Sequence, residues 1–266
     1  MGGLLPFGAP DAPTPLTITV ITVCFNSGAT IANTLQSVAR QTWPHVEHIV
    51  IDGASTDNTL ATVAVNSGRV SRLVSEPDKG IYDAMNKGVA LATGDVVAFL
   101  NADDFYVDNS VLATIAAAIE GEKLDAIYGD VEFFKADQPS RVVRRYDSSR
   151  FTPARLGWGW MPAHPGLFVR RAVFERCGAF NASYRIAGDF EFIVRVFGKA
   201  GLRHRYWHGV AVCMQMGGVS TSGWRATLRL NREMLRACRE NSVPSSWLKL
   251  LSRYPLKIWE FIRPYT

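Results

Sequence analysis

The sequence predicts an α/β protein with a mainly parallel central sheet flanked by helices, followed by a C-terminal helical extension. Apolar runs rich in β-branched residues alternate with segments whose apolar residues recur at helical spacing, a pattern typical of βαβ units. The 266 residues are 47% hydrophobic and 20% charged, with formal net charge +5. This composition suits a globular protein and excludes a disordered chain or a polytopic membrane protein.

The first half of the chain shows the alternation most clearly. The first predicted strand, Leu16–Cys24, stops at turn-forming residues, and the second, Glu47–Asp52, ends in a glycine and a polar stretch. The helix expected between them, Thr30–Gln41, gathers its apolar residues on one face. The same criteria predict helices at Thr59–Asn66, Tyr82–Ala92 and Ser110–Glu120, and strands at Arg72–Ser75, Asp95–Leu100 and Ala126–Val131.

The pattern is less regular beyond Val131. Arg141–Arg155 is basic and polar, and we expect a mobile segment there. A turn-rich aromatic stretch, Gly157–Pro162, follows it. The remaining elements are predicted as strands at Gly166–Arg170 and Arg205–Met216 and helices at Ala172–Cys177 and Asp189–Ala200.

The positive charge is confined to the C-terminal region. Residues 1–221 contain 20 Lys and Arg against 21 Asp and Glu, whereas residues 222–266 contain 9 against 3. We therefore expect a flexible leader over residues 1–15, a folded domain over residues 16–221 and a basic amphipathic helical tail over residues 222–266.

Five arginines of this tail share one helical face. They recur at intervals of four and three residues, with tryptophan, tyrosine and leucine residues nearby: Arg225, Arg229, Arg232, Arg236 and Arg239. Such a helix suits an anionic membrane surface. The alternative is an arginine face in solvent, with the aromatic residues packed on the folded domain.

The cysteines and the N-terminal residues bear on location. The four cysteines form no C-x-x-C pair, so a zinc ribbon and a thioredoxin-type motif have no support. Residues 1–15 contain four prolines and resemble no signal peptide, and no segment has the ~20 apolar residues that span a bilayer. We expect a cytoplasmic protein in a reducing compartment.

Polar and acidic residues follow several predicted strands. Ligands of open α/β sheets bind outside the carboxyl ends of the strands, where Asn26, Asp52 and the run Asn101-Ala102-Asp103-Asp104 are expected. Adjacent carboxylates suit Mg²⁺ or Mn²⁺ together with substrate phosphates, although turns also favour these residues. Asp52 can accept hydrogen bonds from a nucleobase or ribose, or it can hold a turn at Gly53.

Two further residues have side chains suited to chemistry. Asp189 opens a predicted helix after a glycine, so it can cap the helix, act as a general base, or do both. His164 lies in a proline-flanked loop and can reach a ligand. The histidine spacing does not suggest a zinc site, and G-x-S-x-G, P-loop and G-x-G-x-x-G motifs are absent from the sequence.

Taken together, five segments between about Leu16 and Gly218 resemble the family 2 glycosyltransferases, inverting enzymes with the A-type nucleotide-sugar-binding fold. The branch that builds exopolysaccharides, O-antigens and bacterial glycolipids is the most similar. The segments are Ile21-Thr22-Val23-Cys24-Phe25-Asn26, Val50-Ile51-Asp52-Gly53-Ala54-Ser55-Thr56-Asp57, Ser75-Glu76-Pro77-Asp78-Lys79-Gly80-Ile81-Tyr82-Asp83-Ala84-Met85-Asn86-Lys87-Gly88, Thr93-Gly94-Asp95 and Leu100-Asn101-Ala102-Asp103-Asp104.

The resemblance implies roles for individual residues. It makes Asp189 the catalytic base and Asp103 the ligand of a divalent cation, Mn²⁺ or Mg²⁺. It assigns nucleotide binding to Cys24, Asn26, Asp52, Asp57, Lys79, Gly80, Asp83 and Asn86, donor sugar and diphosphate binding to Asn101, Ala102, Asp103 and Asp104, and the acceptor side to His164, Trp160 and Glu191.

The chain departs from the family pattern at two positions. Asn101 stands at the first acidic position of the D-x-D element, which weakens a contact there unless Asp104 compensates. Gly188 replaces the glutamate of the Glu-Asp pair, so the supporting role of that glutamate is absent or passes to Glu191.

The predicted function is transfer of a sugar from a nucleotide-diphosphate donor, with UDP favoured, to a hydroxyl of a lipid-linked acceptor, a cell-envelope glycan or a glycolipid. We expect a peripheral enzyme at the inner face of the plasma membrane, with acceptor specificity between Arg141 and Gly166. One alternative is a nucleotidyltransferase, although Asn26-Ser27-Gly28-Ala29 lacks the basic glycine-rich loop expected of one. Another is a non-catalytic nucleotide-sugar-binding scaffold. Nucleic-acid binding is not favoured, because residues 1–221 have net charge −1.

Overall fold

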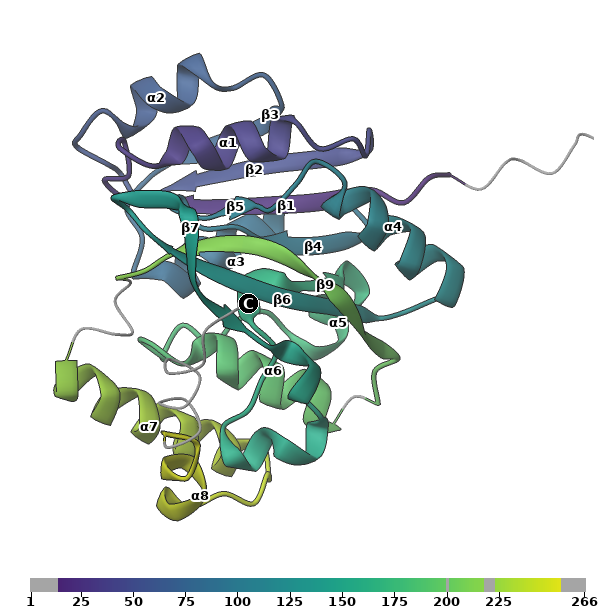
Figure 1. The fold of residues 1–266 in the computed structure, drawn as a ribbon, viewed down its shortest axis with the longest axis vertical. Helices are drawn as coiled ribbons and strands as arrows, with labels where there is room; N and C mark the ends of the chain where they lie inside the picture. Colours follow the sequence, from purple (N-terminus) through teal and green to yellow (C-terminus); the bar gives the residue numbers. More distant parts are fainter. Residues whose placement is uncertain (1–13, 200, 218–222, 255–266) are drawn as a thin grey trace, which may run out of the picture.

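A single mixed sheet forms the centre of the protein in the computed structural model, which describes residues 14–199, 201–217 and 223–254. The nine strands lie in the order β3-β2-β1-β4-β8-β6-β9-β5, with β7 paired to β6 (Figure 1). Their bounds are β1 Ile18–Cys24, β2 Val46–Asp52, β3 Val70–Ser75, β4 Val96–Phe99, β5 Phe105–Tyr106, β6 Ala126–Lys135, β7 Gln138–Tyr146, β8 Leu167–Arg170 and β9 His204–Gln215.

The α/β fold predicted from the sequence is confirmed, and the sheet is parallel in only part of its width. Strands β3, β2, β1 and β4 are parallel neighbours. Beyond β4, strand β8 runs antiparallel to both β4 and β6, whereas β9 runs parallel to β6. The parallel part follows from the βαβ alternation, and the antiparallel pairings come from the region beyond Val131, where the sequence pattern is irregular.

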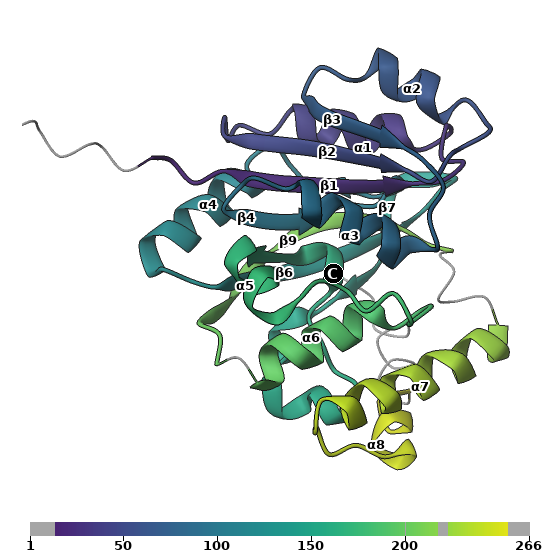
Figure 2. The same ribbon diagram turned by 180° about the vertical axis from the view of Figure 1, so that it is seen from behind.

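Helices cover both faces of the sheet (Figures 1 and 2). They are α1 Ile31–Ala39, α2 Thr59–Val65, α3 Ile81–Leu91, α4 Val111–Glu122, α5 Arg171–Cys177, α6 Gly188–Lys199, α7 Gly223–Glu240 and α8 Trp247–Leu251, with short 3₁₀ helices η1 Ser148–Arg150, η2 Pro153–Trp158 and η3 His164–Gly166. Each predicted helix before residue 200 is present, with bounds that differ by at most two residues.

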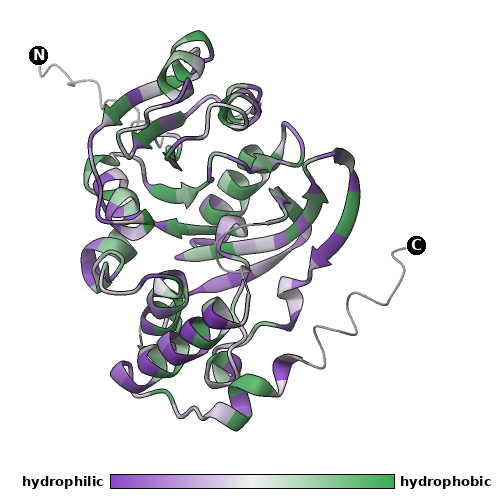
Figure 3. Ribbon diagram, turned by 90° about the vertical axis from the view of Figure 1, so that its left-hand side faces the viewer, coloured by the Kyte–Doolittle hydropathy of each residue, from purple (hydrophilic) through white to green (hydrophobic). Residues whose placement is uncertain are grey.

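The core has two main layers because side chains alternate across each strand. Val96 and Ala98 of β4 pack with α4, whereas Val97 and Phe99 pack with residues of α3, α5 and α6. The central strands are largely green in Figure 3, and the helices carry both colours, as expected of amphipathic helices.

The expectation of a mobile segment at Arg141–Arg155 is wrong. Its first part belongs to β7, which pairs antiparallel with β6, and its remainder contains η1 and η2. The guanidinium of Arg144 lies 4.6 Å from the ring centroid of Phe133, and Arg145 forms a 2.8 Å ion pair with the buried Asp130. The arginines that made the segment look loose therefore cover and hold the neighbouring strand.

The predicted tail begins as helix α7, which packs on α6. Its buried residues, Asn231, Met234, Ala237 and Cys238, share one face. The described residues include no helix long and apolar enough to cross a membrane. Most of the predicted leader, Gly218, and the last apolar and basic residues of the tail lie outside the described residues.

Candidate active site

The carboxyl ends of β1 and β2 meet at one edge of the sheet, where Cys24 and Asp52 are register partners. Asp52 is fully buried, and its carboxylate accepts hydrogen bonds from Ser75 Oγ at 2.6 Å and from Ser55 N at 3.0 Å. Burial raises the pKa of Asp52, but the hydrogen bonds from Ser55 and Ser75 outweigh it and the net shift is downward. Asp52 lies at the edge of the sheet where a nucleotide is predicted to bind. Its hydrogen bonds to Ser55 hold the loop after β2, as in an Asx-turn.

Two loops are joined at this edge. The backbone N–H of Thr56 donates to Asn26 Oδ1 at 2.9 Å, and Asn26 adopts a left-handed conformation with φ of 49°. Asp57 accepts from the backbone N–H groups of Gly28 and Thr59, at the start of α2. Asn26 and Asp57 thus fix the two loops at this edge of the sheet through hydrogen bonds to their backbones.

The segment before α3 is braced by its own side chains. Asp78 accepts from the N–H of Gly80, whose φ is +124°, and Asp83 accepts from the N–H of Lys79. The side chain of Lys79 is exposed. Asn86, predicted to bind nucleotide, instead exchanges two 2.8 Å hydrogen bonds with the backbone of Phe180. Its amide is therefore used to join α3 to the segment before α6.

The acidic turn after β4 lies beside α1 and the end of β9. Thr34 Oγ1 of α1 donates to the carbonyl oxygen of Asp104 at 2.7 Å. Asn101 Nδ2 donates to the Asp104 carboxylate at 3.2 Å, and the N–H of Gln215 donates to it at 3.3 Å. Burial raises the pKa of both Asp103 and Asp104, and for Asp104 the charge of Asp103 adds to the effect. Ala102, which separates Asn101 from Asp103 in the sequence, is buried.

The oxygen atoms of this turn fit a divalent cation. Asn101 Oδ1 is buried without a hydrogen-bond partner, and the Asp103 carboxylate is half-buried. Burial and mutual repulsion of the two carboxylates are relieved when a cation is bound. Within the described residues, no group of three or more His, Cys, Asp or Glu side chains is placed to hold a metal, so a cation here would need ligands from its substrate.

The predicted base lies at the start of α6. Asp189 is half-buried, and Tyr82 Oη of α3 lies 3.3 Å from its Oδ1 and donates to the carbonyl oxygen of Ile186 at 2.7 Å. Burial raises the pKa of Tyr82, so its hydroxyl remains a neutral donor. A Cβ at Gly188 would come within 2.7 Å of the Tyr82 ring. The tyrosine ring therefore fills the space in which the family glutamate would begin.

Helix α7 holds the backbone that leads to Asp189. The carboxylate of Glu233 accepts from the N–H groups of Ile186 and Ala187, each at 2.9 Å, and from that of Arg185. These are the unpaired donors that precede a helix, and a carboxylate is a favourable acceptor there. A residue of the tail is thus the cap of the helix that bears the predicted base.

His164 lies between the acidic turn and Asp189. It precedes β8, which is antiparallel to β4, so its ring stacks on Phe99 at the end of β4 with centroids 5.3 Å apart. Burial lowers the pKa of His164, while the Asp189 charge acts in the opposite direction. Trp160 is half-buried in the preceding loop. His164 thus adjoins the strand that leads to the donor turn and lies close enough to Asp189 for its charge to act on the ring, and we call the donor turn, His164 and Asp189 the predicted rim.

Glu191 is not part of this rim. Its buried carboxylate forms a 2.9 Å ion pair with Arg195 and accepts from Asn241 Nδ2 at 3.3 Å. Residues two apart on a helix point to different faces, which separates Glu191 from Asp189. The predicted acceptor-side role and the suggestion that Glu191 replaces the missing glutamate are corrected by these contacts.

Three residues at the site were not predicted. Tyr82 and Glu233 contact the base or its backbone, but neither spacing nor composition marks a partner more than 40 residues away. Phe25, directly after β1, is 61% exposed and lies beside Gly53. A large exposed aromatic ring at a polar edge is the detectable signal, since such rings stack on planar ligands.

The fold defines an α/β protein with polar and acidic side chains near the carboxyl ends of β1, β2 and β4, the edge at which such sheets bind ligands. The family model described as glycosyl transferase family 2 matches residues 19–178. A PGL/p-HBAD biosynthesis glycosyltransferase of Mycobacterium bovis is 36% identical over 212 residues, covering 76% of this chain and 78% of the relative. The chain belongs to glycosyl transferase family 2, and it is a glycosyltransferase.

More distant relatives and solved structures agree. The Escherichia coli UDP-Glc:alpha-D-GlcNAc-diphosphoundecaprenol beta-1,3-glucosyltransferase WfaP is 26% identical, covering 63% of this chain and 64% of its own. S. aureus TarS 1–349 in complex with UDP-GlcNAc has a TM-score of 0.65 at 19% identity, covering 84% of this chain and 66% of its own. The mannosyltransferase PcManGT from Pyrobaculum calidifontis, in complex with GDP-Man and Mn2+, has a TM-score of 0.62 at 21% identity, covering 89% and 67%. These two structures share the nucleotide-sugar transferase fold of this chain.

Proposed function

We propose that this glycosyltransferase moves a sugar from a nucleotide-diphosphate donor, with UDP favoured, to an acceptor hydroxyl with inversion at the anomeric carbon. The observation that carries the proposal is the position of His164, whose ring stacks on Phe99 at the end of β4 and is close enough to Asp189 for its charge to act on it. Among the described residues, no Lys or Arg forms an ion pair with Asp189, whose Oδ1 accepts from the N–H of Phe190 at 2.8 Å. The UDP-bound structural neighbour and the UDP-Glc-named relative support the choice of nucleotide.

The donor would lie along the carboxyl ends of β1, β2 and β4. The exposed ring of Phe25 offers a stacking surface for the base, and the turn at Gly80, where nothing lies within 4 Å of an added Cβ, leaves room for a ligand to approach the backbone. The exposed Lys79 can balance phosphate charge. Asp52, Asn26 and Asp57 contribute by holding the two loops of this edge.

Asp103, together with Asn101 Oδ1, would hold the divalent cation, Mn²⁺ or Mg²⁺. When bound, such a cation neutralises the charge that develops on a departing diphosphate. The Mn2+ complex of PcManGT supports this choice. Asp104 is more buried than Asp103 and holds the turn through Asn101 and Gln215.

Asp189 would act as the general base. Its carboxylate takes the proton of the acceptor hydroxyl while that oxygen forms a bond to the anomeric carbon. The bond from that carbon to the diphosphate oxygen breaks on the opposite face, which inverts the configuration. Tyr82 and Glu233 fix the carboxylate and its backbone, and the near-attack geometry depends on such fixing.

We propose a lipid-linked acceptor, a cell-envelope glycan or a glycolipid, on the basis of the names of the relatives. The acceptor side would include His164 and Trp160, close to the η2 and η3 segments. The enzyme would then work as a peripheral protein at the inner face of the plasma membrane.

The test is a transfer and donor-hydrolysis assay with UDP-sugars, with and without Mn²⁺. Asp189→Asn should lower kcat by about 100-fold or more, the usual contribution of a general base, with UDP binding unchanged by calorimetry. Asp103→Ala should abolish the metal-dependent reaction. Proton NMR of the first product should show the inverted anomer.

A matched control is Asp125→Asn, a half-buried carboxylate that directly precedes β6 and accepts from the N–H of Arg203 at 2.9 Å. It should retain most of its turnover. Near-normal kcat in Asp189→Asn would reject the base assignment, and absence of both transfer and hydrolysis with every UDP-sugar and metal would favour the non-catalytic scaffold.

A further inference from the structure

The outward side of α7 and the adjoining α8 carry basic and large apolar side chains together. We propose that this surface docks on an anionic phospholipid bilayer. We call it the arginine–tryptophan surface and define it by the exposed residues Arg225, Arg229, Arg232, Arg239, Trp224, Trp247, Leu248 and Leu251. The inference rests on the proposed membrane-bound acceptor and names the part of the chain that meets the lipid.

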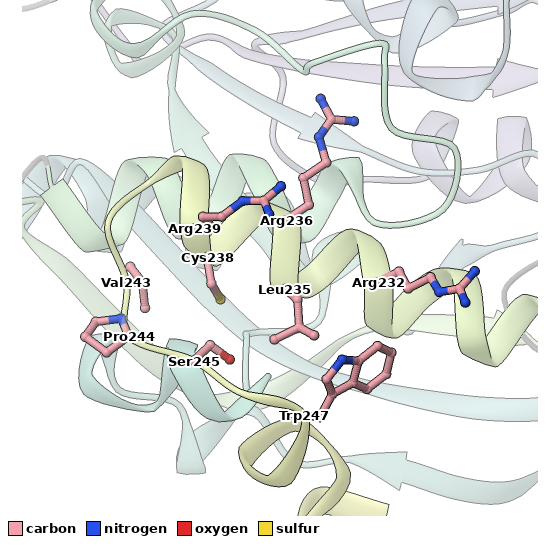
Figure 4. Close-up of a pocket in the computed structure, with 9 residues that line it drawn as sticks. All are labelled: Arg232, Leu235, Arg236, Cys238, Arg239, Val243, Pro244, Ser245 and Trp247. Atoms are coloured by element: carbon pink, nitrogen blue, oxygen red, sulfur yellow. The ribbon is translucent and has the colours of Figure 1, made fainter.

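Two hollows run along this surface. One, of about 390 Å³, is lined by Trp224, Arg225, Leu228, Arg229 and Arg232. The other, of about 510 Å³, lies between α7 and the residues leading into α8, with Arg236 and Arg239 on one side and Pro244 and Trp247 on the other (Figure 4). Arg232 lines both hollows, so they form one continuous surface. Each joins guanidinium groups to an indole ring, a combination that suits a phosphate headgroup above acyl chains.

The charge of this surface is largely uncompensated. Of the two acids of α7, Glu233 caps the backbone before α6, and the exposed Glu240 bonds Tyr184 and pairs with Arg236. Within residues 223–254, no carboxylate forms an ion pair with the four exposed arginines, although the guanidinium of Arg225 lies over Trp224. Each basic side chain near an anionic leaflet contributes to binding, and the contribution falls with ionic strength.

The apolar part distinguishes a bilayer from other anionic partners. Trp224 is 72% exposed and Leu248 is 82% exposed, with Trp247 and Leu251 about half exposed alongside. Leucine side chains gain nothing from a phosphate backbone in water, but they gain from insertion among acyl chains. The opposite face of α7 is buried on α6, so the helix has one face for the protein and one for the lipid.

The surface also adjoins the segment that leads to Asp189. Arg236, at the edge of the larger hollow, donates to Ser183 Oγ at 2.9 Å, and its guanidinium lies 4.4 Å from the ring centroid of Tyr184. Docking through α7 would therefore bring the acceptor side of the rim close to the headgroups, where a lipid-linked hydroxyl is found.

The test is cosedimentation of the full-length protein with vesicles of phosphatidylcholine alone or mixed in equal parts with phosphatidylglycerol. We expect binding to the mixed vesicles that weakens with added NaCl. The quadruple variant Arg225→Gln, Arg229→Gln, Arg232→Gln, Arg239→Gln should bind at least about 100-fold more weakly, given the contribution of each basic residue. Trp224→Ser with Leu248→Ser should also weaken binding while leaving the charge unchanged.

The matched control removes four exposed cations elsewhere, at Arg40, Arg72, Lys123 and Arg176, by the same change to glutamine. It should bind like the parent. Equal loss in both quadruple variants, or equal binding to neutral vesicles, would overturn the inference. So would displacement of the vesicles by single-stranded DNA at equal phosphate concentration, which would indicate a nucleic-acid partner.

A transfer assay with a soluble acceptor separates this inference from the proposed function. The α7 quadruple variant should retain transfer to that acceptor, because its substitutions leave the rim untouched. Vesicle binding without any transfer by the parent would contradict the proposed function alone, and transfer without vesicle binding would contradict the docking surface alone.

Discussion

The absence of a side chain at Gly188 leaves space beside the proposed base that Tyr82 fills. Three ring carbons of Tyr82 lie within 2.9 Å of the position that a Cβ on Gly188 would take. In the family pattern a glutamate precedes the base, and here a tyrosine from α3 takes up that space and reaches Asp189. The side chain that contacts the proposed base therefore comes from another element and not from its own helix.

Substitution of Gly188 tests this exchange. Gly188→Ala should lower the free energy of unfolding by about 1–3 kcal/mol, as overpacking does, and should lower kcat because Tyr82 and Asp189 are displaced together. The measurement is urea unfolding combined with steady-state kinetics. Gly198→Ala, in the same helix with its nearest neighbour at 3.5 Å, is the control and should be neutral or stabilising. An unchanged kcat in Gly188→Ala would show that the contact with Tyr82 does not position the base.

For single residues, the sequence predicts where in a strand or helix a side chain lies better than it predicts which partner that side chain contacts. Asp52, Asp103 and Asp189 lie at the ends of strands or at the start of a helix, as their neighbours in the sequence indicate. What Asn86 and Glu191 bond to could not be predicted, because their partners at Phe180 and Asn241 lie 94 and 50 residues away. Side-chain roles that depend on such distant partners require the folded structure.

Among the elements, α7 has the most unexpected role. It was predicted as a separate basic tail, yet it bonds the backbone before α6 through Glu233. The segment after it also holds the aromatic loop: Ser245 Oγ donates to the Gly157 carbonyl at 2.6 Å and Arg253 to that of Gly159 at 3.1 Å. Both segments flanking the predicted acceptor side are thus held from the C-terminal region.

The cap supplied by α7 can be weakened without changing its fold. Glu233→Gln keeps the shape but loses the charge that three N–H donors share, so we expect a loss of about 1–2 kcal/mol in the free energy of unfolding and a several-fold lower kcat. Donor KM should change less than kcat, because Glu233 contacts the backbone before Asp189 and none of the residues assigned to nucleotide binding. The measurements are thermal unfolding and kinetics on a soluble acceptor.

Glu240→Gln is the companion variant, since Glu240 bonds Tyr184 and Arg236 of the same region but not the N–H groups before Asp189. It should lose comparable stability and keep its kcat. If the two variants lost activity equally, the effect of Glu233 would be general loosening of α7 and not capping of α6.

Strand β7 could not be predicted from the hydrophobic pattern of the sequence. Its arginines hide the alternation that identifies a strand, because their apolar stems and ion pairs do the packing that aliphatic residues do elsewhere. The βαβ half was predictable because β1, β4 and most of β2 are buried on both faces and its helices are amphipathic. Hydrophobic periodicity identifies a strand only where its inward side chains are apolar and buried, and not where they are arginines held by ion pairs.

For the molecule as a whole, acid should be destabilising through one buried histidine. Burial lowers the pKa of His48 from 6.5 to about 3, and its Nδ1 has no partner. Below pH 6.5 the unfolded chain gains a proton that the folded protein does not. This contribution to stability is therefore complete above that pH and is lost as the pH falls toward about 3.

Unfolding in urea at two pH values measures this effect. From about pH 7 to about pH 5, His48 alone should cost about 2 kcal/mol in the free energy of unfolding. His48→Gln, which retains a polar group for Thr22, should reduce the drop by that amount. His45→Gln, on an exposed neighbour in the sequence, should leave the drop as it is. An identical pH dependence in the parent and His48→Gln would contradict the prediction.

The cap from Glu233 to the backbone before Asp189 has a consequence for how such enzymes diversify. If the lipid-binding residues and the cap of α6 lie on two sides of α7, exchange of the C-terminal region between two relatives would also exchange the residue that caps α6. Inheritance of a new membrane preference would then require compensating change in residues 183–189 within the recipient domain. On the proposed docking, such an exchange would alter the membrane contact and the backbone before Asp189 together.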